Sequence, residues 1–126
     1  MSDLDRVLVG RSILIVEDEP LVALDVRAAL NAAGASVVSA ANCSEALRMA
    51  ESPGLSAAIV DIDLGRGEDC SEVCERLSER RIPFLFFTGE VRPDILLKWP
   101  DAPVLTKLAN KARIIDVVAG LTALAP

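Results

Sequence analysis

The sequence contains no histidine, and its three cysteines form no C-x-x-C pair. A zinc site built from thiolates and imidazoles is therefore disfavoured. Cys70 and Cys74 have the spacing of two thiols on one helical turn, and Cys43 stands apart from both. An odd number of cysteines without a disulfide pattern fits a reducing compartment.

Long apolar runs, a basic leader and basic clusters are also missing. No apolar run approaches the roughly 20 residues that a membrane span needs, and no positively charged leader precedes a hydrophobic stretch. The formal net charge of −6 disfavours binding to a nucleic-acid duplex, which requires clustered Lys and Arg. We therefore expect a cytoplasmic protein with neither a membrane nor a nucleic-acid partner.

The 126 residues, of which 52% are hydrophobic, have the usual size of one domain. Short apolar runs alternate with longer segments of helical periodicity, which predicts an α/β fold with helices on both faces of a parallel sheet. The predicted strands are 12–16, 36–40, 57–60, 83–87 and 103–105. The predicted helices are 20–33, 44–51, 70–80, 91–99 and 111–124.

We expect residues 11–126 to form this single domain, with no attached output domain. Residues 1–10 are expected to be an N-terminal tail. The apolar residues of this tail stand among charged ones, so it either frays or packs against the sheet, and the sequence leaves both alternatives open.

Polar residues that can bind ligands or take part in a reaction follow four of the predicted strands. Ligands of an open parallel sheet bind beyond the carboxyl ends of its strands, where the connecting loops converge. We expect these residues to gather at one edge of the sheet: Glu17, Asp18, Asp61, Asp63, Thr88, Glu90 and Lys107.

Carboxylates that lie this close repel one another unless a cation neutralises them. Oxygen ligands alone suit Mg2+, so we predict Asp18 and Asp61 as direct ligands and Glu17 as a ligand through water. Asp61 then has a second oxygen available as a nucleophile for a phosphoryl group. Mg2+, the Lys107 ammonium, and the Thr88 hydroxyl with a nearby backbone N–H would each neutralise one phosphoryl oxygen.

Four short motifs carry a resemblance to a known family. Val16-Glu-Asp-Glu19, Val60-Asp-Ile-Asp63, Phe87-Thr-Gly89 and Thr106-Lys107 occur in order and at suitable spacing on a pattern of five β-α units. Over nearly its whole length the chain resembles the receiver domain of bacterial two-component response regulators. The resemblance implies a flavodoxin-like, doubly wound sheet with strand order 2-1-3-4-5 and five helices.

The resemblance also implies roles for single residues. Asp61 is the expected phosphoacceptor, Glu17 and Asp18 are the acidic pair, and Lys107 is the lysine that contacts the phosphoryl group. The remaining implied roles are a metal ligand through the backbone carbonyl (Asp63), the switch hydroxyl (Thr88), an amide that contacts phosphate (Gly89), and side chains that tune the hydrolysis of the aspartyl phosphate (Asp63 and Glu90).

The implied partners are a sensor histidine kinase, a downstream protein or a histidine phosphotransfer protein, and a second copy of the chain. The run Ile82-Pro-Phe-Leu-Phe-Phe-Thr-Gly-Glu90 resembles a receiver subgroup with a Phe-Ala-Thr-Gly motif, whose members are often paired with HWE-type kinases. The protein would be no enzyme in the usual sense, because it promotes only its own phosphorylation and dephosphorylation.

Two positions depart from the family pattern. Leu108 stands where proline usually follows the lysine, so we expect a trans peptide bond after Lys107, because a cis bond without proline costs roughly 2.5–4 kcal/mol. Val104 stands where many receivers have an aromatic residue that turns inward on phosphorylation. Signalling must then rely on movement of loops and of the fourth helix.

Two alternatives come from other functional classes. Asp61-Ile-Asp63 superficially resembles the nucleophile motif of haloacid-dehalogenase-type phosphatases, although those enzymes usually carry it on their first strand. A degenerate receiver that acts as a phosphorylation-independent docking or dimerisation module is the second alternative, and the departures at Val104 and Leu108 favour it.

Overall fold

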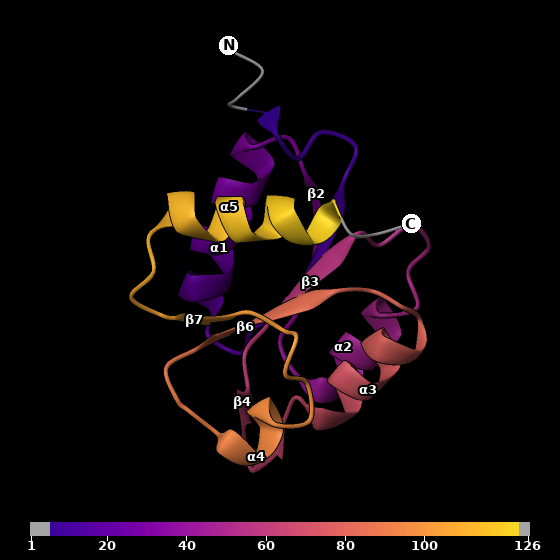
Figure 1. Cartoon of the computed structure of the whole chain (residues 1–126), viewed down its shortest axis with the longest axis vertical. Helices are drawn as coiled ribbons and strands as arrows, with labels where there is room; N and C mark the ends of the chain where they lie inside the picture. The colour runs from indigo at the N-terminus through magenta and orange to yellow at the C-terminus, as the bar shows by residue number, and fades with distance from the viewer. Residues whose placement is uncertain (1–5, 124–126) are drawn as a thin grey trace.

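The computed structural model describes residues 6–123, and its centre is a parallel β-sheet (Figure 1). The strands of this sheet are β1 (Ser12–Val16), β2 (Ser36–Ala40), β3 (Ala57–Val60), β6 (Phe84–Thr88) and β7 (Val104–Thr106). Their spatial order is β2-β1-β3-β6-β7 and every neighbouring pair is parallel. This is the predicted doubly wound, flavodoxin-like order, and each strand lies within one residue of its predicted position.

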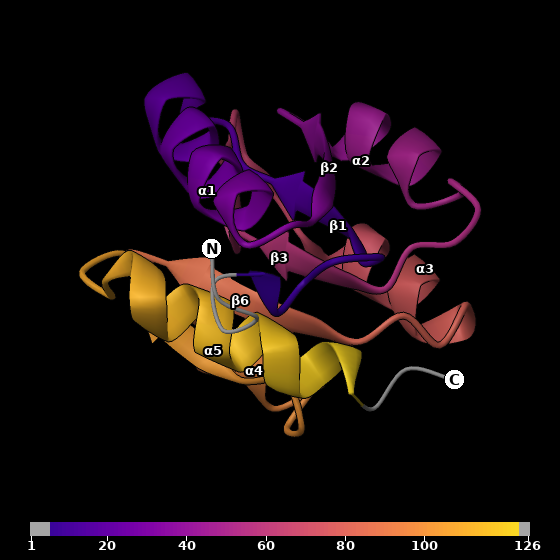
Figure 2. The same cartoon turned by 90° about the horizontal axis from the view of Figure 1, so that it is seen from above.

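Helices cover both faces of the sheet (Figure 2). They are α1 (Pro20–Ala32), α2 (Cys43–Met49), α3 (Ser71–Glu79), α4 (Pro93–Leu96) and α5 (Lys111–Thr122). Successive residues of a strand point to opposite faces, so Ile13 packs with α1 and α5 while Leu14 packs with α2, α3 and α4. No helix within residues 6–123 is long and apolar enough to cross a membrane.

Local sequence explains where most helices begin. Pro20 occupies the start of α1, where a missing N–H is tolerated. The side chain of Asn42 accepts a hydrogen bond from the Glu45 amide at 2.9 Å, and that of Asn110 accepts one from the Arg113 amide at 2.8 Å. These caps satisfy donors that lack partners inside the helix.

The prediction of a helix over 91–99 was wrong in its length, because α4 spans only Pro93–Leu96. Pro93 has no N–H and cannot continue a helix that began earlier, and Pro100 disfavours helical backbone at Trp99. The short helix is followed by an extended connection, residues 97–103, before β7.

A second, two-stranded sheet was not predicted. Strands β4 (Asp63–Gly65) and β5 (Glu68–Asp69) pair in antiparallel fashion directly after the acidic end of β3. Arg66 and Gly67, which connect them, have φ values of 54° and 77°. Positive φ at both central residues is the mark of a tight hairpin turn whose twist matches that of its strands.

The described part of the N-terminal segment packs against the domain. Leu8 is fully buried among residues of α1 and α5, and its amide donates a hydrogen bond to the Ala33 carbonyl at 2.9 Å. Of the two alternatives left open by the sequence, residues 6–10 therefore adopt the packed one. Residues 1–5 lie outside the described residues.

We predict that Leu8→Ala lowers the free energy of unfolding by about 2–5 kcal/mol, because it empties a fully buried site. Val7→Ala is the matched control, since Val7 is 42% exposed and should cost much less. Urea unfolding of both variants, followed by circular dichroism, measures the difference. Equal stability of the two variants would contradict the packing role of Leu8.

Candidate phosphoryl-accepting site

Backbone hydrogen bonds hold the predicted site residues at the carboxyl ends of the central strands. The Asp61 amide donates to the Val16 carbonyl at 2.9 Å, and the Lys107 amide donates to the Thr88 carbonyl at 3.2 Å. The Glu17 amide donates to the Ala40 carbonyl at 2.9 Å, which extends the hydrogen bonding of β1 to β2 beyond Val16. Side chains from β1, β3, β6 and β7 are thus brought to one edge, as predicted.

Three carboxylates form a cluster at this edge. Glu17, Asp18 and Asp61 each offer an oxygen atom, and the three oxygens lie within 4.8 Å of one another. Glu17 and Asp61 are buried, and Asp18 is partly buried. Oxygen donors at such separations, with neither imidazole nor thiolate among them, fit a hard divalent cation such as Mg2+.

Lys107 reaches the cluster from the end of β7. Its Nζ lies 3.0 Å from Asp61 Oδ2 and also donates to the Glu17 carboxylate, and it stands 5.7 Å from the centre of the Phe87 ring. No cis peptide bond occurs within residues 6–123, so the bond between Lys107 and Leu108 is trans, as predicted. The Lys107 ammonium contacts Asp61 with this trans backbone.

Burial shapes the charge of the cluster. Desolvation, followed by a hydrogen bond with Asp61, raises the pKa of Glu17 from an ordinary value of 4.5 to about 8 despite the attraction of Lys107. Burial opposes the charge on Lys107, but hydrogen bonds to Glu17 and Asp61 outweigh it, so the pKa of Lys107 is raised. A cation that enters the cluster would therefore compete with a proton on Glu17.

The remaining predicted residues border the same space, a cavity of about 500 Å³. Its walls are formed by Asp18, Glu19, Val22, Asp61, Asp63, Thr88, Gly89, Glu90 and Lys107. Sequence reasoning had assigned no role at the site to Glu19 or Val22, which stand just before α1 and in its first turn. Glu17 lies beneath this cavity rather than on its wall.

Two of these residues make local hydrogen bonds. The Thr88 hydroxyl lies 3.1 Å from both the amide nitrogen and the carbonyl oxygen of Glu90, so it is engaged by its own loop rather than by Asp61. Asp63 Oδ1 accepts a hydrogen bond from the Gly65 amide at 2.9 Å, and the Asp63 side chain is exposed. Thr88 is the last residue of β6, whereas the sequence had suggested that it follows the strand.

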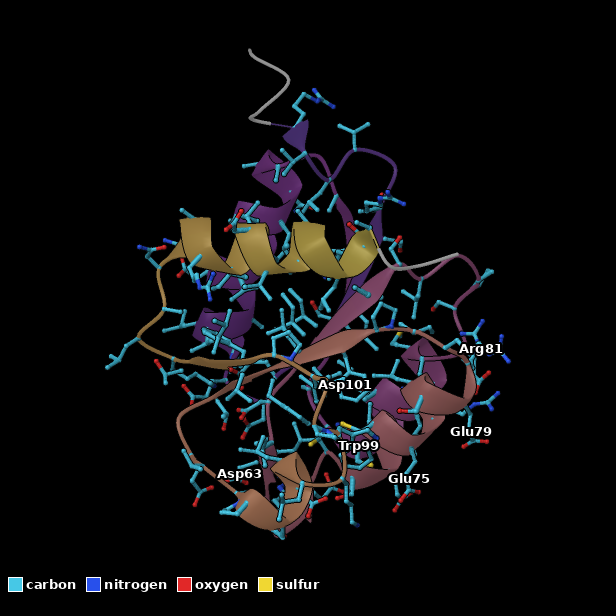
Figure 3. The ribbon with its side chains drawn as sticks, viewed as in Figure 1. Asp63, Glu75, Glu79, Arg81, Trp99 and Asp101 are labelled. Carbon is cyan, nitrogen blue, oxygen red and sulfur yellow. The ribbon has the colours of Figure 1, made fainter. Side chains whose placement is uncertain are left out.

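A second hollow lies away from the acidic cluster. This groove of about 440 Å³ is bordered by Phe84, Trp99 and Asp101 among others, and Figure 3 labels the last two together with Asp63. Trp99 is half-buried, with its ring 6.2 Å from that of Phe84. None of the predicted site residues borders this groove.

Comparisons with known proteins agree with this geometry. The family model described as the response regulator receiver domain matches residues 13–119. Transcriptional regulatory protein PdtaR of Mycobacterium tuberculosis is 27% identical over 114 residues, which cover 90% of this chain. The chain spans only about half of that protein's length (56%).

Solved structures give the same picture. SdrG from Sphingomonas melonis Fr1 is 35% identical, with a TM-score of 0.76 over 96% of this chain and 98% of that one. A response regulator receiver protein from Sinorhizobium medicae WSM419 is 24% identical, with a TM-score of 0.82 over 91% of this chain and 96% of that one. A CheY-like receiver from Methanospirillum hungatei JF-1 is 20% identical, with the same TM-score over 90% of this chain and 94% of that one.

We predict that Glu17→Gln stabilises the metal-free protein increasingly as pH rises. A carboxyl whose pKa is raised in the folded state favours folding below about pH 4.5, and this contribution is lost as pH rises through about 8. Glutamine does not ionise, so the variant should gain about 1 kcal/mol or more over the wild type at alkaline pH, since one pKa unit equals about 1.4 kcal/mol.

Urea unfolding in a chelating buffer at about pH 5 and about pH 8.5 measures this change. Glu45→Gln, at a half-buried position outside the cluster, is the control for the loss of one acid. A stability difference between Glu17→Gln and wild type that stays constant with pH would contradict the prediction.

Proposed function

Because the chain belongs to the family of response regulator receiver domains, we propose that it accepts a phosphoryl group on Asp61 and thereby switches a protein-interaction surface. The observation that carries this proposal is the joint position of Asp18, Asp61 and Lys107 at one cavity. The family favours a phosphoacceptor over a phosphatase that turns over other substrates.

Asp61 would be the nucleophile. One of its carboxylate oxygens attacks the phosphorus, and the new O–P bond forms while the P–N bond to a kinase phosphohistidine breaks, with the electron pair leaving on the imidazole nitrogen. The other oxygen, Oδ2, lies 3.0 Å from Lys107 Nζ. The same ammonium then neutralises an oxygen of the transferred phosphoryl group.

The acidic cluster would hold the cation that this reaction requires. Bound Mg2+ supplies positive charge that neutralises the phosphoryl oxygens as their charge develops. Asp18 and Asp61 would ligate it directly, the Asp63 backbone carbonyl would add a further ligand, and Glu17 would act through water. Asp63 and Glu90, whose side chains are exposed, would tune hydrolysis of the aspartyl phosphate.

The switch would pass through the loop after β6. Thr88 and the Gly89 amide would turn toward the phosphoryl oxygens, and Thr88 would exchange its hydrogen bonds with Glu90 for one to phosphate. The loop leads directly to α4, whose four residues leave it few helical hydrogen bonds that would resist movement. Val104 has no aromatic ring that could turn inward with this change.

Large apolar side chains are exposed on this loop and on the segments that follow it, and a protein partner would cover them. These side chains, on consecutive segments from the β6–α4 loop to the start of α5, are Val91, Leu97, Val104 and Leu108. We propose that this surface binds a downstream protein, with a second copy of the chain as the alternative occupant, and that it binds no nucleic acid, which the net charge of −6 disfavours.

The phosphodonor would be a sensor histidine kinase of the HWE type, and onward transfer to a histidine phosphotransfer protein is a variant of the same chemistry. A stand-alone receiver is supported by the match to SdrG over 98% of that chain. The second candidate function is a docking module that ignores phosphorylation, which the departures at Val104 and Leu108 favour.

We predict that the wild-type protein, incubated with Mg2+ and acetyl phosphate, gains one phosphoryl group in intact-mass measurements, and that Asp61→Asn gains none, because the amide is no nucleophile. Asp63→Asn is the matched control, because its side chain is exposed and its backbone carbonyl is retained. The Asp63→Asn variant should still gain one phosphoryl group. An unmodified wild type, or a modified Asp61→Asn, would refute Asp61 as the acceptor.

We also predict that Mg2+ followed by beryllofluoride, a mimic of the phosphoryl group, changes the fluorescence of Trp99. Trp99 packs on Phe84 just after α4, so movement of this helix alters its surroundings. Thr88→Ala should bind the mimic with a smaller change, because the hydroxyl that pulls the loop is missing. A wild-type signal that stays constant at both steps would favour the docking module.

A further inference from the structure

Asp18 differs from the other two members of the acidic cluster. The Glu17 and Asp61 carboxylates both accept hydrogen bonds from Lys107, whereas the Asp18 side chain makes none with any other residue in 6–123. Asp18 also borders two hollows, the site cavity and a neighbouring one of about 580 Å³ beside the hairpin. No hydrogen bond within this range therefore fixes which way its carboxylate points.

The backbone of Gly65 limits the space beside this carboxylate. Gly65, on strand β4, lies so close that a Cβ atom added to it would stand 3.0 Å from Asp18 Oδ2. This separation is shorter than an ordinary carbon–oxygen contact, so any other residue at this position would press on the carboxylate. Because glycine has no Cβ, it leaves the Asp18 carboxylate the place that it occupies.

The hairpin is held in place and cannot easily retreat from Asp18. Asp69 pairs with Arg92 before α4 at 3.7 Å, and its Oδ1 accepts a hydrogen bond from the Ser71 amide at 2.9 Å. Glu68 accepts one from the Cys43 amide at 3.4 Å. Strand β5 is thus tied to α2, α3 and the start of α4, so a crowded contact at Gly65 on the paired strand β4 would displace the Asp18 carboxylate instead.

We propose that Gly65 is a positioning residue that sets the place of Asp18 and thereby the selectivity of the cluster for Mg2+. The inference rests on the proposed function, because it requires the cluster to bind the ion. Mg2+ demands nearly ideal octahedral geometry with short bonds, whereas Ca2+ accepts longer and more variable ones. A shift of Asp18 by a few tenths of an ångström therefore weakens Mg2+ binding more than Ca2+ binding.

Gly67 provides a matched control on the same hairpin. Gly65 and Gly67 both have φ of 77°, so alanine suffers the same backbone strain at either position. A Cβ on Gly67 would have nothing within 4 Å, however, so only Gly65→Ala adds the contact with Asp18. Urea unfolding without metal, compared between the two variants, verifies that their folds are equally intact.

Isothermal titration of Mg2+ and of Ca2+ into both variants tests the proposal. Gly65→Ala should raise the dissociation constant for Mg2+ by about tenfold, as expected for loss of a group that orients a ligand, with a smaller rise for Ca2+. Gly67→Ala should bind both ions as the wild type does. In an Asp18→Ala background, Gly65→Ala should change the residual Mg2+ affinity no further.

The outcomes separate this inference from the proposed function. A wild type that binds no Mg2+ refutes both, whereas a wild type that binds it, together with equal affinities for Gly65→Ala and Gly67→Ala, overturns the role of Gly65 alone. A parallel loss for both ions, or a loss that persists without Asp18, also overturns it. If Gly65→Ala fails to fold, Gly65→Asn carries a Cβ in a residue that tolerates positive φ and undergoes the same titrations.

Discussion

The crowding of three carboxyl groups at one edge of the sheet is the constraint on which the rest of this domain depends. Parallel strands end at the same edge, so the sheet that forms the core also crowds Glu17, Asp18 and Asp61 together. Two full charges about 5 Å apart repel by roughly 3 kcal/mol at an effective dielectric constant near 20, which is a large fraction of a domain's stability. Lys107 supplies only one positive charge, and desolvation by burial, followed by the hydrogen bond with Asp61, raises the pKa of Glu17.

The excess of carboxyl groups over the single lysine links the binding of several species at this edge. A divalent cation, a proton on Glu17 or the lysine can each relieve the repulsion, so their occupancies are linked. A phosphoryl group on Asp61 would add negative charge and draw on the same lysine. Thr88 borders the cavity at which these groups meet, and its loop leads to the short helix α4. A change in charge at the cluster can therefore alter the loop and the helix at the surface.

The sequence predicted the sheet because its strands carry apolar residues toward both faces, as Ile13 and Leu14 do. The same alternation of short strands and helices placed the polar strand ends correctly. The β4–β5 hairpin escaped prediction because Asp63–Asp69 is short and polar and its turn depends on positive φ at Arg66, which residue type alone does not indicate. The limited space between Gly65 and Asp18 depends on tertiary structure and has no signal in the sequence.

The side chain of Lys107, which follows β7, loses its conformational freedom when the chain folds. Leu108, which is 94% exposed, stands after Lys107, so no proline ring stiffens the backbone there, and the ammonium is positioned through its flexible side chain. A lysine side chain that becomes fixed loses up to about 2 kcal/mol of rotamer entropy. Since Lys107 already contacts Glu17 and Asp61, most of this entropy is lost when the chain folds. In the proposed reaction, the incoming phosphoryl group would therefore meet a preorganised cation.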